Sequence, residues 1–246
     1  MNAEYDQIAE QYRDSKQLPF RDLAEAYTFF QMAGDLRGQT ILDLACGEGF
    51  LTRKLRRRGA DRVVGVDLSE AMVRLGQERE AVEQLGNLEF QQHDAADMPH
   101  LGTFDTVTAL YLLNYADSRK LLRQFVQTAY DNLRPGGRFL GFNDNVAQDP
   151  TTYGNHRKYG FIKECPTSRT EGDAIRYTFF NPDGTAFQFN NFYLHPETYA
   201  AVFAEVGFED FRWVPAEIEP VHAMDPYWAD FLRDQPLVGF TAWRPE

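Results

Sequence analysis

The stretch ILDLACGEGFLTRKLRRRGADRVVGVDLS (residues 41–69) joins two apolar runs through a short turn that contains Gly47 and Gly49. The pattern predicts a strand, a glycine turn, a helix and a second strand that ends near Asp67. A strand that ends in Gly-x-Gly and leads into a helix brings backbone amides and the positive helix end close to a ligand. A carboxylate at the end of the next strand can accept hydrogen bonds from two ribose hydroxyls. The stretch therefore predicts a nucleoside site between two strand ends.

The segments around this stretch continue the alternation of strand and helix. We expect strands at residues 40–45, 62–69, 88–95, 104–113 and 138–144, separated by helices at 50–59, 70–86 and 117–137. Strands that alternate with helices of this length are typical of parallel βαβ units in an open sheet with both faces covered. The sequence therefore predicts an α/β, doubly wound, Rossmann-like fold.

The alternation changes after residue 142. Residues 175–194 form two alternating aromatic runs around Asn-Pro-Asp-Gly, which is a strong β-hairpin signal. A helix at 195–207, a strand at 208–214 and a final strand at 236–244 should follow. We interpret residues 1–246 as a single domain that comprises a helical lid (1–34, with helices at 4–15 and 18–38), a cofactor-binding core (35–142), a substrate-side hairpin insertion (143–194) and a C-terminal part of the core (195–246).

Composition limits the possible partners and location. The net charge of −12 argues against a nucleic-acid partner, which would need a basic face. The two cysteines, Cys46 and Cys165, are too few for a disulfide framework or a zinc site and fit a reducing cytoplasm. The N-terminus has no apolar signal core and no run approaches a membrane span, so we expect neither export nor membrane insertion. Aromatic residues make up 14% of the chain, which favours a flat, aromatic-lined pocket.

The glycine turn alone is compatible with more than one nucleotide. A dinucleotide-binding turn would have a small third residue at position 52, where Thr52 stands instead, and this disfavours a nicotinamide dehydrogenase. The third strand ends in HDAADMP (residues 93–99), which places Asp94 where it can accept a hydrogen bond from an adenine amino group. Three successive strand ends thus offer glycines, one acid for ribose and one acid for adenine.

Five segments match the successive motifs of one family. They are LDLACGEG (42–49), VVGVDLSEAM (63–72), HDAADMP (93–99), FDTVTALYLLNY (104–115) and NLRPGGRFL (132–140). With them the chain resembles the class I S-adenosylmethionine-dependent methyltransferases. The resemblance implies a mostly parallel seven-stranded sheet with an antiparallel last strand, and methyl transfer from S-adenosyl-L-methionine with S-adenosyl-L-homocysteine as product. Residues 5–21 resemble a smaller branch of bacterial small-molecule enzymes, nearest to the azapteridine N-methyltransferases of toxoflavin-type pathways.

The resemblance implies roles for the residues at the strand ends. Gly47 and Gly49 would carry the methionine part of the cofactor, and Asp43 would hold the glycine turn or the cofactor ammonium. Leu110 would bind that ammonium through its backbone carbonyl. The remaining cofactor-binding candidates would hold the ribose (Asp67), the adenine amino group (Asp94) and the adenine walls (Leu68, Met72 and Ala95), with Ala45 in the glycine turn.

Candidates on the substrate side come from three segments. Tyr5 and Tyr12 lie on the first helix and could orient the acceptor or take part in proton transfer, which makes them the catalytic candidates. Asn114 and Tyr115 follow the fourth strand, where the family faces its acceptor. The insertion supplies the other candidates, which are His156 as a base and Phe179 and Phe189 as an acceptor roof. Tyrosines on an amphipathic face and a loop histidine also have purely structural interpretations.

The acceptor class is inferred by exclusion. The segment LYLLNYA (110–116) lacks the Asn-Pro-Pro-Tyr found at this place in DNA and glutamine amino-methylating families, and we expect no metal site. The acidic composition and aromatic insertion favour a small flat heterocycle of secondary metabolism, such as antibiotic or toxin biosynthesis, methylated on nitrogen. An O-methyltransferase and a catalytically inactive cofactor-binding protein are the alternatives. We expect a small-molecule substrate, no nucleic-acid or membrane partner, and a monomer or homodimer.

Overall fold

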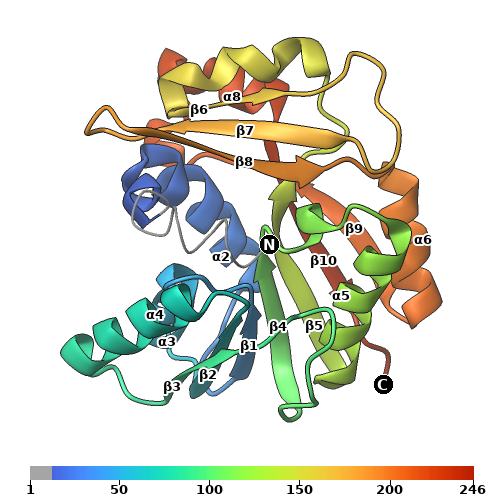
Figure 1. The fold of residues 1–246 in the computed structure, drawn as a ribbon. Coiled ribbons are helices and arrows are strands. Elements are labelled where there is room, and N and C mark those ends of the chain that lie inside the picture. The colour runs from blue at the N-terminus through green and yellow to red at the C-terminus, as the bar shows by residue number, and fades with distance from the viewer. Residues whose placement is uncertain (1–12) are drawn as a thin grey trace.

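A computed structural model describes residues 13–246, which form a seven-stranded sheet flanked by helices and a smaller second sheet (Figure 1). The large sheet has the order β3-β2-β1-β4-β5-β10-β9. Its strands are β1 (Thr40–Leu44), β2 (Arg62–Asp67), β3 (Leu88–Gln92), β4 (Phe104–Leu110), β5 (Leu133–Asp144), β9 (Glu209–Pro215) and β10 (Leu237–Trp243). Strands β1 to β5 pair in parallel, whereas β10 runs antiparallel to both β5 and β9. The predicted Rossmann-like sheet with its antiparallel last strand is confirmed.

Helices cover both faces of this sheet. The helices α2 (Tyr27–Ala33), α3 (Phe50–Arg57) and α4 (Glu70–Glu83) lie on one face, and α5 (Arg119–Asp131) and α6 (Pro196–Val206) lie on the other (Figure 1). Because both faces are covered, the central strands are buried along most of their length. Val63, Val64 and Val66 of β2 are all fully buried.

The insertion after β5 forms the second sheet, with the antiparallel order β6-β7-β8. Strands β7 (Ala174–Phe180) and β8 (Ala186–Phe192) form the predicted hairpin, and the amide of Gly184 donates to the carbonyl of Asn181 across its turn. Strand β6 (Phe161–Glu164) and the 3-10 helix η4 (Pro150–Tyr159) had no clear sequence signal. The second sheet lies across the carboxyl ends of the parallel strands (Figure 1). It therefore faces the edge where a Rossmann-like fold binds its ligands.

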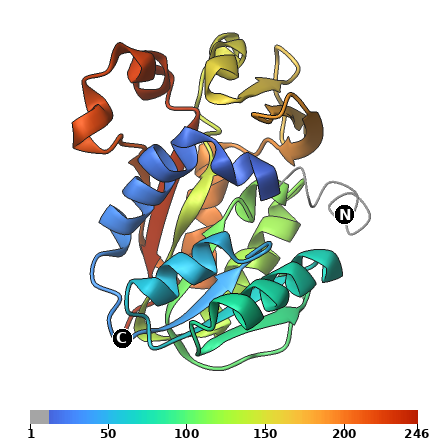
Figure 2. The ribbon, with the colours of Figure 1, turned by 90° about the vertical axis from the view of Figure 1, so that its left-hand side faces the viewer.

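Residues 13–26, where the described part of the chain begins, lie between the two sheets (Figure 1 and Figure 2). The helix expected at residues 18–38 is present over residues 19–33, where the π-helical stretch η2 (Arg21–Ala26) runs directly into α2, but it ends at Ala33 and not near Gly38. Phe20 is buried, and its ring centroid lies 5.2 Å from that of Phe161 on β6. The part of the predicted lid that the structure describes thus includes residues that belong to the hydrophobic core. The helix expected at residues 4–15 lies almost wholly outside the described residues.

A helical segment between β9 and β10 was also not expected. It consists of α7 (Pro220–Ala223), the 3-10 turn η5 (Pro226–Trp228) and α8 (Ala229–Asp234). Trp228 packs against Tyr159 of η4 with ring centroids 5.3 Å apart, so this segment packs against the helical turn that leads into the second sheet. Within residues 13–246, none of the helices has the length and apolar character needed to cross a membrane.

Candidate active site

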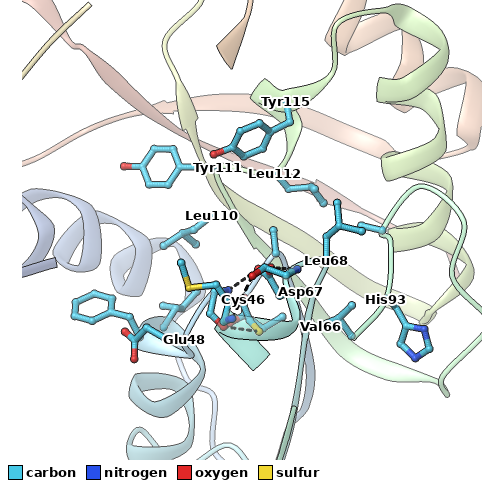
Figure 3. A pocket seen from close by; sticks show the side chains of 18 of the residues that line it. Cys46, Glu48, Val66, Asp67, Leu68, His93, Leu110, Tyr111, Leu112 and Tyr115 are labelled. Atoms are coloured by element: carbon cyan, nitrogen blue, oxygen red, sulfur yellow. Dashed lines mark hydrogen bonds between the residues drawn. The ribbon is translucent and has the colours of Figure 1, made fainter. Parts of the chain in front are cut away.

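A large pocket opens at the carboxyl ends of β1, β2 and β4 (Figure 3). Its empty volume is about 1080 Å³, which includes the space of the open mouth. Of the ten residues that sequence patterns assigned to cofactor binding, all but Gly49 line it: Asp43, Ala45, Gly47, Asp67, Leu68, Met72, Asp94, Ala95 and Leu110. The motifs quoted from sequence therefore converge on one cavity.

Gly47 and Gly49 are glycines for two different structural reasons. Both have left-handed backbones, with φ of 56° at Gly47 and 81° at Gly49. A Cβ atom at Gly47 would have no heavy atom within 4 Å, so hydrogen at this position leaves pocket space open. A Cβ atom at Gly49 would lie 2.5 Å from the ring of Phe90 on β3. Gly47 thus shapes the pocket, whereas Gly49 allows the helix and sheet to pack.

Backbone amides hold the Asp67 carboxylate at the pocket wall. One oxygen accepts a hydrogen bond from Gly47 N (2.8 Å) and the other from Ser69 N (2.9 Å). The carboxylate therefore joins the end of β2 to the glycine turn after β1. Asp94 is held in a similar way, because its Oδ1 accepts from Ala96 N at 2.8 Å. Each bond uses one lone pair, so both carboxylates keep acceptor capacity.

Asp43 lies beneath the turn and is 1% exposed. Its two oxygens accept hydrogen bonds from the hydroxyls of Thr52 (2.7 Å) and Thr108 (2.8 Å). Burial raises the pKa of Asp43 from 3.8 to about 6 despite these bonds. Sequence reasoning used Thr52 only to disfavour a dinucleotide. Its spacing of nine residues from Asp43, on the first turn of the helix that follows the strand, is the signal that could have indicated this bond.

A second, smaller cavity lies between the N-terminal segment and the second sheet. We call it the aromatic chamber; it is narrow, and its empty volume of about 320 Å³ includes space that is open to solvent. Its walls are Phe20, Arg21, Tyr111, Tyr115, Phe161, Tyr177, Phe179, Phe189, Asn191 and Leu237. Tyr111 and Tyr115 line both cavities, and Figure 3 shows their rings on one side of the large pocket, opposite Asp67 and Val66. The two cavities therefore adjoin at these two tyrosines.

Tyr111 is anchored by a buried ion pair. It follows β4 directly, has a left-handed φ of 67°, and donates a hydrogen bond of 2.5 Å to Oε2 of Glu25. The same oxygen accepts from Arg21 Nη1 at 2.6 Å, and the side chains of Arg21 and Glu25 are 2% and 0% exposed. The Arg21 guanidinium also lies over the rings of Tyr111 and Phe179. A left-handed tyrosine is costly and is typical of a functional site.

The far side of the chamber contains a second buried ion pair. Asp144, at the end of β5, accepts from the ammonium of Lys163 (2.6 Å) and from the hydroxyl of Tyr177 (2.5 Å). Lys163 and Asp144 are both fully buried, and burial lowers the pKa of Lys163. The hydroxyl of Tyr177 is thus committed to Asp144, while its ring faces the chamber.

The substrate-side candidates fall in different places. Tyr115, Phe179 and Phe189 line the chamber. Asn114 lines neither cavity and is fully buried in the 3-10 turn η3 (Leu113–Tyr115). His156 is fully buried against the ring of Phe161 and lines neither cavity. Burial lowers the pKa of His156 to about 4, so the ring is neutral near pH 7. Tyr5 and Tyr12 lie outside the described residues.

Comparisons with known proteins identify methyltransferases that resemble this chain. A family profile described as "Methyltransferase domain" matches residues 41–137. The ubiquinone/menaquinone biosynthesis C-methyltransferase UbiE of Klebsiella pneumoniae (strain 342) is 31% identical over 202 residues, which cover 77% of this chain and 75% of that protein. UbiE of Enterobacter sp. (strain 638) is 41% identical over 113 residues, 44% of this chain and only 43% of the relative's length.

A solved structure shows the same fold over nearly the whole chain. The S-adenosylmethionine-dependent methyltransferase from Clostridium acetobutylicum ATCC 824 superimposes with a TM-score of 0.69 at 16% identity, covering 98% of this chain and 99% of that one. The chain therefore belongs to the class I S-adenosylmethionine-dependent methyltransferases, and S-adenosyl-L-methionine is its cofactor.

Proposed function

We propose that this enzyme methylates a ring nitrogen of a small, flat heteroaromatic molecule that binds in the aromatic chamber, with S-adenosylmethionine in the large pocket. The observation that best supports this proposal is that Tyr111 and Tyr115 line both cavities. A methyl donor in one cavity and an acceptor in the other would meet at these rings. Holding two reactants in line and away from water accounts for most of the rate in such a transfer.

The pocket residues fit the cofactor by shape and chemistry. The space beside Gly47 admits the methionine part, and the amide-held carboxylate of Asp67 offers acceptors to the ribose hydroxyls. Asp94 accepts from the adenine amino group, while Met72 and Ala95 form apolar walls. Asp43 holds the turn from below and attracts the cofactor ammonium. When bound, the sulfonium supplies an electrophilic methyl group; the chain's own residues supply position and a dry environment.

The chamber also contains a route for a proton. A ring N–H that becomes N–CH₃ must lose its proton, and Tyr111 lines both cavities. As Tyr111 takes the acceptor's proton, its own hydroxyl proton passes along the 2.5 Å hydrogen bond to the Glu25 carboxylate. Arg21 holds that carboxylate in place from the other side. The net charge of the site stays constant, because the positive charge that leaves the sulfur reappears as a proton.

Methylation of a ring carbon is the second candidate. Two relatives are named as C-methyltransferases of ubiquinone and menaquinone biosynthesis. Carbon methylation of a hydroxylated ring also requires that a phenol proton be removed, and the Tyr111–Glu25 hydrogen bond would serve this reaction equally. The two candidates differ in the acceptor atom and not in the machinery that holds it.

The test is product analysis with S-adenosylmethionine carrying a ¹³C-labelled methyl group. Pools of N–H heteroaromatics and of hydroxylated aromatics are incubated with the enzyme, and the chemical shift of the transferred carbon tells an N-methyl from a C-methyl product. A labelled N-methyl heteroaromatic supports the first candidate, and a C-methyl phenol replaces it with the second. Transfer only to carboxylates or aliphatic amines would contradict both.

A further inference from the structure

Asn191 breaks the aromatic pattern on the inner face of the second sheet. Along β8, residues 187, 189 and 191 point to the same face because side chains alternate along a strand. Phe187 and Phe189 are buried aromatic residues, whereas the third position holds an amide. Asn191 lines the chamber and is only 2% exposed.

The Asn191 amide oxygen has no hydrogen-bond partner within residues 13–246. Leaving a buried acceptor unsatisfied costs about 1–3 kcal/mol. A leucine of similar size at this place would avoid that cost and continue the apolar face. The amide is therefore unfavourable for the fold alone, which indicates a use in binding.

Three other polar side chains on the chamber wall already make hydrogen bonds. The hydroxyl of Tyr177 donates to Asp144, and Tyr111 and Arg21 both donate to Glu25. Among the side chains that line the chamber, Asn191 is the one with a buried oxygen acceptor that lacks a partner.

We propose that Asn191 is a specificity residue that accepts a hydrogen bond from an N–H group on the edge of the acceptor. This inference rests on the proposed function and narrows it. The acceptor is a planar heteroaromatic that carries an N–H donor beside its stacking faces. A ring of the same shape without that donor leaves the Asn191 oxygen buried and unpaired, so it binds less tightly.

The test uses two probes of nearly equal shape, 2-quinolone and coumarin, in which a ring N–H is replaced by a ring oxygen. Each is titrated calorimetrically into the full chain saturated with S-adenosylhomocysteine. We expect 2-quinolone to bind about tenfold more tightly than coumarin, because one buried hydrogen bond is worth about 1.4 kcal/mol or more. In Asn191→Leu the preference should disappear, chiefly through weaker binding of 2-quinolone.

Asn190→Leu is the matched control, because residue 190 is exposed on the outer face of the same strand. It should keep the preference. Equal binding of the two probes by the unaltered protein, or a preference that survives in Asn191→Leu, would overturn the inference. The binding result does not depend on turnover. If no heteroaromatic is methylated, the proposed function is wrong, but a preference for the N–H probe would still show that Asn191 binds an N–H group.

Discussion

Tyr111 and Glu25 are 86 residues apart in sequence, yet the tyrosine hydroxyl donates to the glutamate carboxylate at 2.5 Å. The bond ties the end of β4 to the π-helical turn η2, and Arg21 of that turn completes the arrangement. The Glu25 carboxylate is fully buried. Through the Tyr111 hydroxyl it is connected to a side chain that lines both cavities. The first two predictions concern this arrangement.

Replacing Tyr111 by Phe should remove the proton route and leave the chamber wall nearly intact. General acid–base groups contribute roughly 10²–10⁴ to a rate, so we expect single-turnover methyl transfer to fall by about 10² or more. Cofactor affinity, measured calorimetrically, should change by less than about twofold. Tyr130→Phe, which changes a tyrosine that lines neither cavity, is the control and should be inert. A Tyr111→Phe enzyme of full activity would reduce the hydroxyl to a structural contact.

Breaking the buried ion pair should be costly for the fold. Glu25→Leu leaves the guanidinium of Arg21 buried without its carboxylate, so the free energy of unfolding in urea should fall by about 3–5 kcal/mol. The double change Glu25→Leu with Arg21→Met should recover most of that loss, because an apolar pair fits the same space. The exposed pair of Asp35 and Arg37 offers a comparison, and Asp35→Leu should have no measurable effect. A double variant no more stable than Glu25→Leu would contradict this interpretation.

Asp43 should give cofactor binding a pH dependence. Because burial raises its pKa from 3.8 to about 6, the folded protein binds a proton at Asp43 more tightly than the unfolded chain does. Its contribution to the free energy of unfolding is therefore present below 3.8 and is lost as the pH rises to about 6. Attraction for the cofactor ammonium has the opposite sign, since it grows as the carboxyl ionises.

We accordingly expect S-adenosylmethionine affinity to rise between about pH 5 and about pH 7, across the pKa of Asp43 near 6. In Asp43→Asn the affinity should be weaker at all of these pH values and its dependence on pH should flatten. Calorimetric titrations across the range measure both effects. A variant with the same pH slope as the unaltered protein would show that Asp43 is not the titrating group.

The two glycines of the turn should respond differently to substitution. Gly47→Ala places a methyl group in pocket space and costs about 1–2 kcal/mol of backbone strain, so cofactor affinity should fall more than stability does. Gly49→Ala forces the ring of Phe90 to move, so the melting temperature should fall more than affinity does. Combining Gly49→Ala with Phe90→Leu should restore part of the stability. Equal effects of the two single changes on cofactor affinity would contradict this difference between the roles of Gly47 and Gly49.

Much of the cofactor-binding pocket could be predicted from the sequence, because its residues lie at fixed positions relative to the ends of the strands. Gly47, Asp67 and Asp94 each lie at the end of a strand or within three residues of it, and parallel strands bring their carboxyl ends to one edge. The aromatic hairpin was likewise predictable from alternation and its turn. Such signals are local, so one sequence is enough to detect them.

The chamber was harder to predict because its polar contacts join distant segments. Glu25 and Tyr111 come from elements 86 residues apart, and Lys163 reaches Asp144 across the two sheets. Neither pair has a spacing that local patterns could reveal. His156 illustrates the converse, since a histidine on an inserted segment suggested a base but is packed against Phe161 with its ring fully buried. Side-chain burial in an insertion depends on tertiary packing, which single-sequence patterns do not encode.

A crystal structure of the protein with S-adenosylhomocysteine and 2-quinolone would show directly whether the two cavities form one active site. We expect the nucleoside between Asp67 and Asp94 and the flat ring among Phe179, Phe189 and Asn191. The cofactor sulfur should face that ring past Tyr111. Cofactor density in the large pocket with the ring bound outside the chamber, or with Tyr111 and Tyr115 separating the two ligands, would contradict the claim that the two cavities form one active site.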